Sequence, residues 1–175
     1  MIAGHARLSD TLIARYARFP DRKPAAPDDC RNRLLNCMEI TRPLPSPNPV
    51  EQTDAALLQT AEEVSDAVFR SVPVPPLMRE HFWVQSSVFA GCIFPAPVLQ
   101  GSHFTDVTFR NCDLSNADLS GCSFQRVEFV ECKLVGANLS EGTWQHVVFE
   151  RCKMEFANFT LGKFRGVRFA GGTMR

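Results

Sequence analysis

The sequence predicts a mainly β protein in which a stack of four-sided coils follows a helical and proline-rich N-terminal segment. Three observations lead to this fold class. Large apolar residues return at every fifth position, without interruption, from Phe89 to Met174. A small or slim side chain stands two positions before nearly every one of them. All 12 prolines lie at or before Pro97, so a regular array replaces an irregular region near that point.

The N-terminal part contains three stretches with the apolar spacing of a helix. Residues 6–19 and 29–40 each place apolar side chains at helical intervals. Residues 53–70 give the clearest pattern, with Leu57 and Val64 on one face and the acidic residues mostly elsewhere. We therefore expect helices in these three stretches.

Prolines separate these predicted elements. The stretch PLPSPNP at 43–49 breaks any helix and predicts an extended linker. The stretch VPVPPL at 72–77 ends the helix predicted over 53–70. The sequence thus predicts an N-terminal segment at residues 1–83 and a regular array at residues 84–175.

A period of five fits neither a helix nor a flat strand. It fits a backbone that turns a corner every five residues, with one large and one small side chain pointing inward on each side. Four sides make a coil of twenty residues, so residues twenty apart, such as Val107 and Val127, lie directly above one another. The predicted structural core consists of the large inward residues Phe104, Phe109, Leu114, Leu119, Phe124, Phe129, Leu134, Leu139, Trp144, Phe149, Met154, Phe159, Phe164 and Phe169.

One side of the array carries the motifs NADL (116–119), GANL (136–139) and FANF (156–159). They resemble the A(D/N)LXX pattern of the pentapeptide-repeat family. The resemblance covers residues 84–175 and implies a right-handed quadrilateral parallel β-helix. About four and a half coils, each rising about 4.8 Å, would give a length of roughly 22 Å.

Such a stack exposes apolar residues at both ends unless something covers them. Phe82, Trp83 and the preceding helix are the candidate covers at the N-terminal end. No candidate follows Met174. We expect either an end-to-end homodimer through the C-terminal coil or a chain that continues beyond Arg175, because an uncovered coil is an open sheet edge.

The residues with reactive side chains point to packing rather than to catalysis. Four cysteines lie twenty residues apart from Cys92 to Cys152, and neighbours in one column point the same way, which disfavours a disulfide. A free buried cysteine behaves as a small apolar residue. The four histidines form no metal-ligand spacing, and the array has no phosphate loop or nucleophile motif. The sequence predicts no enzyme activity, metal or cofactor.

Charge is distributed unevenly along the array. Residues 101–150 sum to −4, and the remaining residues to the end sum to +5. One interpretation is a solvated surface with paired columns, in which Asp106 meets Arg126 and Glu131 meets Arg151. The other is a basic end that binds an acidic partner, formed by Arg151, Lys153, Lys163, Arg165, Arg168 and Arg175.

Four outward positions carry apolar residues, which need a cover in water. Either the helix predicted over 53–70 docks on them, or they form a surface for a partner. These residues are Val130, Val135, Val148 and Phe156.

The leading functional hypothesis is a non-catalytic protein-interaction module with a protein partner that the sequence does not identify. The neutral total charge argues against a dedicated nucleic-acid binder.

The resemblance suggests a bacterial effector exported by a type III-like route, or a DNA mimic that binds DNA gyrase. The mimic requires a continuous acidic surface, whereas the array sums to +1. A catalytic domain after Arg175 is a further alternative. No apolar run approaches the ~20 residues of a membrane span, and without export we expect a cytoplasmic protein.

Overall fold

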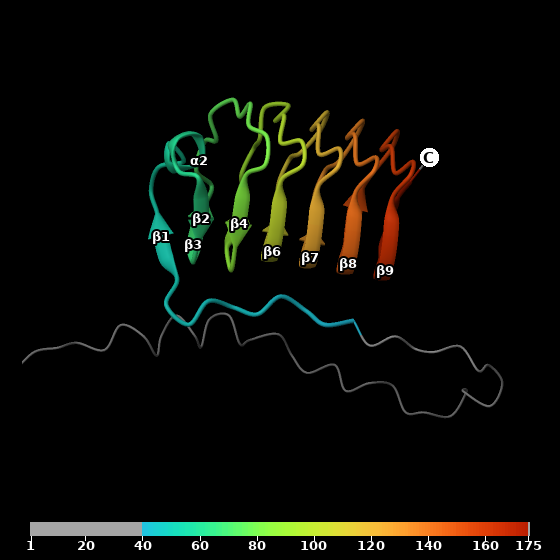
Figure 1. Cartoon of the computed structure of the whole chain (residues 1–175), viewed down its shortest axis with the longest axis horizontal. Helices are drawn as coiled ribbons and strands as arrows, with labels where there is room; N and C mark the ends of the chain where they lie inside the picture. The colour runs from blue at the N-terminus through green and yellow to red at the C-terminus, as the bar shows by residue number, and fades with distance from the viewer. Residues whose placement is uncertain (1–39, 175) are drawn as a thin grey trace, which may run out of the picture. The chain divides into compact units, whose positions relative to one another are not determined.

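The structure of the chain is a computed structural model that describes residues 40–174 (Figure 1). The helix predicted over 6–19, all but the last residue of the one over 29–40, and Arg175 lie outside these residues. The described part is a parallel β-solenoid of about six coils. It contains a single short helix, α2 (Leu57–Thr60). The predicted fold class is therefore confirmed.

The strands of the solenoid pair in parallel with their equivalents in the next coil. One side stacks in the order β1-β3-β5-β6-β7-β8-β9, and β2 and β4 lead into β6 on the adjoining side (Figure 1). The strands are β1 (Val50–Gln52), β2 (Glu63–Ser65), β3 (Ala67–Arg70), β4 (Trp83–Gln85), β5 (Val88–Ala90), β6 (His103–Arg110), β7 (Ser123–Val130), β8 (Thr143–Lys153) and β9 (Lys163–Thr173).

The register confirms the period of twenty residues. Phe109, Phe129 and Phe149 pair in succession, and their rings stack at centroid distances of 5.0 and 4.9 Å. These distances equal the ordinary spacing of paired strands, so the coil rise itself sets the ring stacking. Bridges at Asp113↔Lys133 and Asp118↔Asn138 mark the two remaining sides of each coil.

The corners explain how a chain can turn every five residues. Corner residues take the left-handed backbone conformation, with φ of 56° at Asp106, 55° at Asn116 and 66° at Gly121. Glycine, asparagine and aspartate enter this region at the lowest cost. The chain therefore places short polar residues or glycine at many corners.

The helix predicted over 53–70 is wrong. Apart from α2, this stretch forms β2 and β3, with Val64 paired to Val84 and Phe69 next to Phe89 in register. Val64 and Phe69 are five residues apart and so extend the inward period, and stacking on the next coil outweighs the helical spacing. The solenoid thus begins ahead of residue 84, which is why it has more coils than the sequence predicts.

The N-terminal end is closed from within the stretch 53–70, by the short helix α2, and not by Phe82 or Trp83. Leu58 on α2 is 1% exposed and plugs the end of the stack. The Arg79 guanidinium donates hydrogen bonds to the carbonyl oxygens of Leu58 and Ala61, and it lies 4.6 Å from the ring centroid of Phe82. Phe82 is itself buried within the stack, whereas the expected cover Trp83 is half exposed and stacks outside on His103.

The predicted core residues from Phe104 to Met154 lie inside the coils and are at most 4% exposed. The last three predicted core residues are more exposed. Phe159 is half-buried, and Phe164 and Phe169 are 47% and 45% exposed. They belong to the last described coil, which no further described coil covers.

Candidate functional site

Strand β9 forms an open edge of the solenoid. It pairs with β8 along its length, and no strand among residues 40–174 pairs with its other side. Phe164 and Phe169 are half exposed there, whereas Trp144 and Phe149, one coil earlier, are fully buried. An edge with free backbone groups and apolar side chains can accept an additional strand.

Three of the predicted basic residues lie along this edge. Lys163, Arg165 and Arg168 occupy outward positions on β9, and Lys153 lies at the end of β8. All four are exposed, and no ion pair or hydrogen bond within the described residues engages their side chains. These four cations are exposed to solvent. Arg175 lies outside the described residues.

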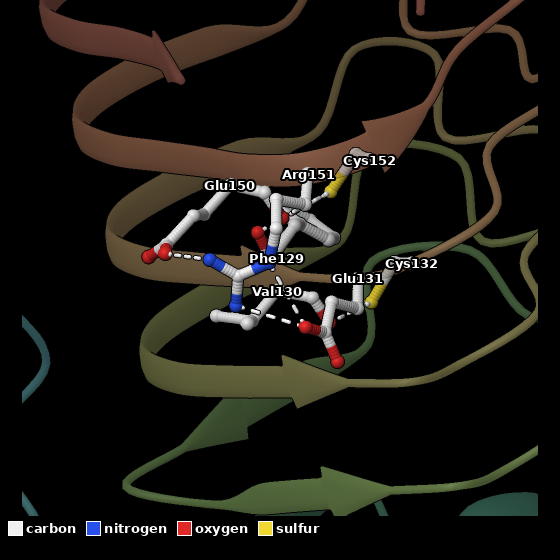
Figure 2. Close-up of polar contacts among 7 residues, drawn as sticks. All are labelled: Phe129, Val130, Glu131, Cys132, Glu150, Arg151 and Cys152. Carbon is white, nitrogen blue, oxygen red and sulfur yellow. Dashed lines mark hydrogen bonds and ion pairs between the residues drawn. The ribbon is translucent and has the colours of Figure 1, made fainter. Parts of the chain in front are cut away.

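Arg151 differs from the other predicted basic residues because two glutamates engage it (Figure 2). Its Nη2 lies 2.9 Å from Glu131 Oε1 in the preceding coil, and its Nη1 contacts Glu150. The charge pairing predicted for Glu131 and Arg151 is therefore present. Arg151 contributes less free positive charge to the basic end than the cations on β9.

The predicted apolar patch does not form one surface. Val148 is 2% exposed, and Val130 and Val135 are half-buried. Phe156 is 79% exposed at a corner of the last described coil. The helix expected to cover these residues does not exist, because residues 53–70 are part of the solenoid.

Leu161 is a candidate that the sequence analysis missed. It occupies the corner after Phe156, and both residues are 79% exposed. Their φ angles are 58° and 60°, a conformation that costs about 1–2 kcal/mol for residues with a Cβ. The signal in the sequence that could have identified Leu161 is a large apolar residue at a corner position of the repeat. Together they place two exposed apolar side chains beside the open edge.

A second surface is occupied by the chain itself. Residues 40–49 run past β6, β7 and β8 without forming a helix or strand, and we call them the strap (Figure 1). The Thr41 N–H donates to His146 Nδ1 at 3.3 Å, and the Leu44 N–H donates to Asp106 Oδ1 at 2.9 Å. The sequence predicted an extended linker here but not its contact with the coils.

An ion pair lies between these two hydrogen bonds. Arg42 Nη1 is 3.2 Å from Glu128 Oε1, at an angle that does not make a hydrogen bond. The Glu128 side chain is 8% exposed and that of Arg42 is 64% exposed. Val148 in the next coil, which pairs with Glu128, is also buried although it occupies an outward position.

Asp106 is held ionised on this surface. It is buried, which acts to raise its pKa, but hydrogen bonds from Arg126 and from the Leu44 N–H keep the pKa below its ordinary value. Arg126 donates from Nε at 2.7 Å and from Nη2 at 2.6 Å. The pairing predicted for Asp106 and Arg126 is therefore present, and it fixes the carboxylate that receives the strap.

The cysteines of the solenoid serve packing in this structure. Cys152 Sγ donates to the Phe129 carbonyl oxygen at 3.3 Å, and Cys132 Sγ donates to that of Val130 at 3.4 Å (Figure 2). Burial raises the pKa of Cys122 to about 12, so its thiol stays protonated. Within residues 40–174, no cluster of three or more His, Cys, Asp or Glu residues is arranged to hold a metal ion.

The described residues include no helix with the length and hydropathy that a bilayer span requires.

A protein-family model agrees with this geometry. Residues 102–175 match the family model described as a pentapeptide repeat region. No curated protein matches the sequence. The chain is similar in structure to a pentapeptide repeat protein from the thylakoid lumen of Arabidopsis thaliana, with 23% identity over 66% of this chain and 71% of that chain, at a TM-score of 0.34.

Two further solved structures are similar at lower identity. One is the pentapeptide repeat protein Rfr23 from the cyanobacterium Cyanothece 51142, with 14% identity over 61% of this chain and 59% of that chain, at a TM-score of 0.30. The other is trypsin-treated QnrB1, a plasmid-mediated fluoroquinolone resistance protein, with 14% identity over 65% of this chain and 83% of that chain, at a TM-score of 0.22. The family match and the twenty-residue coils agree that residues 102–175 are a pentapeptide repeat region.

Proposed function

We propose that this chain is a non-catalytic protein-interaction module that binds an acidic partner through its last described coil. The observation that carries the proposal is the combination on β9 of an unpaired edge, half-exposed aromatic residues and exposed cations. Phe164 and Phe169 supply apolar surface, and Lys163, Arg165 and Arg168 surround it with positive charge.

A partner would bind by extending the solenoid. Its backbone would pair with β9, as β9 pairs with β8, and its apolar residues would cover Phe164 and Phe169. Acidic side chains on the partner would meet the β9 cations and raise the rate of association. Phe156 and Leu161, at adjacent corners of the same coil, would add apolar contact at the rim.

A second copy of this chain is the alternative occupant of the edge. End-to-end pairing of two β9 strands would bring two sets of the cations Lys163, Arg165 and Arg168 to one interface. Like charges across an interface disfavour association, so this arrangement is less favourable than an acidic partner. Light scattering over a range of protein concentrations distinguishes the two, because only self-association makes the mass concentration-dependent.

The proposal is tested by comparing the proteins that the wild-type chain and charge-reversed variants retain. The test variant is K163E/R165E/R168E. The matched control is E62K/E63K/E80K, which reverses three exposed charges near the other end of the solenoid. We expect the control to keep the bound partner and the β9 variant to lose it. A partner retained equally by both variants would contradict the assignment to β9.

Two alternatives from the sequence lead to different experiments. DNA mimicry requires a continuous acidic surface, whereas ion pairs such as Asp106–Arg126 place opposite charges in one column. Supercoiling by DNA gyrase that is unchanged by micromolar protein discards this alternative. Export by a type III-like route is tested by the secretion of a reporter fused behind residues 1–49.

A further inference from the structure

The spacing of the strap's contacts along its own chain matches the rise of the coils that it crosses. Thr41 contacts His146, Arg42 contacts Glu128, and Leu44 contacts Asp106, one residue from each of three successive coils. An extended proline-rich chain rises about 3.1 Å per residue, so three residues span about 9.3 Å. Two coil steps of about 4.8 Å span about 9.6 Å. An extended chain can therefore place the N–H groups of Thr41 and Leu44 two coil steps apart without distortion.

The strap also places its backbone donors where the surface has acceptors. The N–H groups of Thr41 and Leu44 each have a partner on the coils. Pro43 and Pro45 have no N–H that would be left without a partner, and they hold the chain extended. The Arg42 guanidinium supplies the single charged contact. The recognised pattern is x-Arg-Pro-x-Pro, where x is any residue with a backbone N–H.

Part of the receiving surface is held by contacts that do not involve the strap. Two hydrogen bonds from Arg126 hold Asp106 in place, and Glu128 pairs in register with Thr108 and Val148 on the neighbouring strands. The acceptors recognise two backbone N–H groups and one cation. None of these contacts requires that the strap belong to the same chain.

We propose that the face formed by Asp106, Glu128 and His146 recognises an extended Arg-Pro segment of a partner protein, and that residues 41–45 occupy this face as an internal competitor. The strap is tethered to the solenoid, because β1, which follows it in the chain, pairs with β3. This covalent connection gives the strap a high effective concentration at the face. The identical strap of a second copy would make only the contacts that the chain's own strap already makes. A partner segment with further contacts outside the face can displace the strap. This site is separate from β9 and does not depend on the function proposed for that edge.

The test uses full-length variants and a labelled peptide, ITRPLPSPNP, with the sequence of residues 40–49. The variant R42A/L44P removes the charged contact and one N–H donor while it keeps the strap extended. The matched control R42K/L44A keeps both the cation and the N–H group. By fluorescence anisotropy, we expect R42A/L44P to bind the peptide about tenfold more tightly than the wild type or the control, because the internal competitor is weakened. Equal affinities for all three chains would overturn the proposal.

A charge exchange distinguishes recognition from a general loosening of the structure. In the R42A/L44P background, E128R should lose affinity for ITRPLPSPNP by about tenfold and bind the peptide with Glu in place of Arg. A variant that binds both peptides equally would contradict recognition by Glu128. Circular dichroism checks that each variant keeps its fold. A wild-type dimer that becomes monomeric in R42A/L44P would instead assign the face to a second copy's strap and overturn the proposal.

Discussion

The two ends of the described solenoid differ in how they meet water. At the N-terminal end, Leu58 is 1% exposed, and Arg79 ties the closing segment to the stack. At the other end, Phe164 and Phe169 are about half exposed, although they continue the same inward columns. The same repeat is therefore closed at one end by irregular chain and open at the other.

This difference shows that the repeat sequence alone does not cover the apolar residues at either end of the stack. Every coil presents the same apolar residues to its neighbours, so closure needs residues that break the period. The segment at 50–61, with β1 and α2, breaks it and buries Ala55 and Leu58 at this end. The open end keeps the period to the last described residues, and this is the end where we propose that a partner binds.

The largest expected effect concerns the Phe column. Phe129 is fully buried between stacked rings, so Phe129→Ala should lower the free energy of unfolding by about 3–5 kcal/mol. Phe169→Ala, on the open edge, should cost less than half as much. Urea denaturation followed by circular dichroism measures both. Equal losses would mean that the edge is covered in solution.

The next largest expected effect on stability concerns Leu58 at the closed N-terminal end. Leu58→Ala should lower the free energy of unfolding by about 2–5 kcal/mol, because it leaves a cavity under the closing segment. The matched variant Leu161→Ala removes an equal side chain that is 79% exposed at the open end, and it should change stability by less than about 0.5 kcal/mol. A large loss for Leu161→Ala would show that this residue is buried in solution.

Backbone strain at the open end gives a smaller effect of opposite sign. Phe156 has φ of 60° and an exposed side chain, so Phe156→Gly should stabilise the chain by about 1 kcal/mol. At the corner one coil earlier, Gly136→Ala should destabilise it, because φ is 68° and the new Cβ would lie 2.6 Å from Asn116 Oδ1. Thermal unfolding of both variants gives the comparison. If Phe156→Gly stabilises the chain and also weakens partner binding, the strain is retained for the interaction.

Most of the fold could be predicted because the repeat determines it locally. The period of five predicts that Phe109, Phe129 and Phe149 lie in one column, and the strand register confirms it. The same period was obscured over 53–70, where Val64 and Phe69 continue it but Leu57 and Ala61 also satisfy helical spacing. Stacking on the next coil decided between the two patterns, and a single sequence window does not contain that information.

The surfaces were less predictable than the core because they depend on what crosses them. Val148 is an outward position by its place in the repeat, yet the structure buries it. The twenty-residue period predicts the contact of Arg151 with Glu131, but it does not predict the second contact, with Glu150. The contacts of the strap join residues more than sixty positions apart, and no periodicity links Leu44 to Asp106.

Acid should loosen the strap while it leaves the β9 edge unchanged. The pKa of Asp106 lies below its ordinary value of 3.8 in the folded chain. Its contribution to stability is therefore present above that value and is lost as the pH falls through the lower folded pKa. Below pH 4 the wild type should lose stability more steeply than Asp106→Asn, as measured by urea denaturation at each pH. Parallel losses would show that the Asp106 carboxylate does not contribute to the strap's attachment.

The smallest expected effect is a difference in thiol reactivity along the cysteine column. Cys112 and Cys152 are both buried, but Cys152 is paired only to Gly172 of the last described coil on its outer side. Fraying of that coil should expose Cys152 first, because local opening near an uncovered end costs less than opening in the middle. In a C30S/C37S background, which removes the thiols outside the described residues, mass spectrometry after brief alkylation at neutral pH should show Cys152 labelled before Cys112. Cys122, whose pKa is raised to about 12, should also lag behind Cys152. Equal rates at Cys112 and Cys152 would mean that the stack opens as one unit, and the contrast between the closed and open ends would then lie in binding and not in local stability.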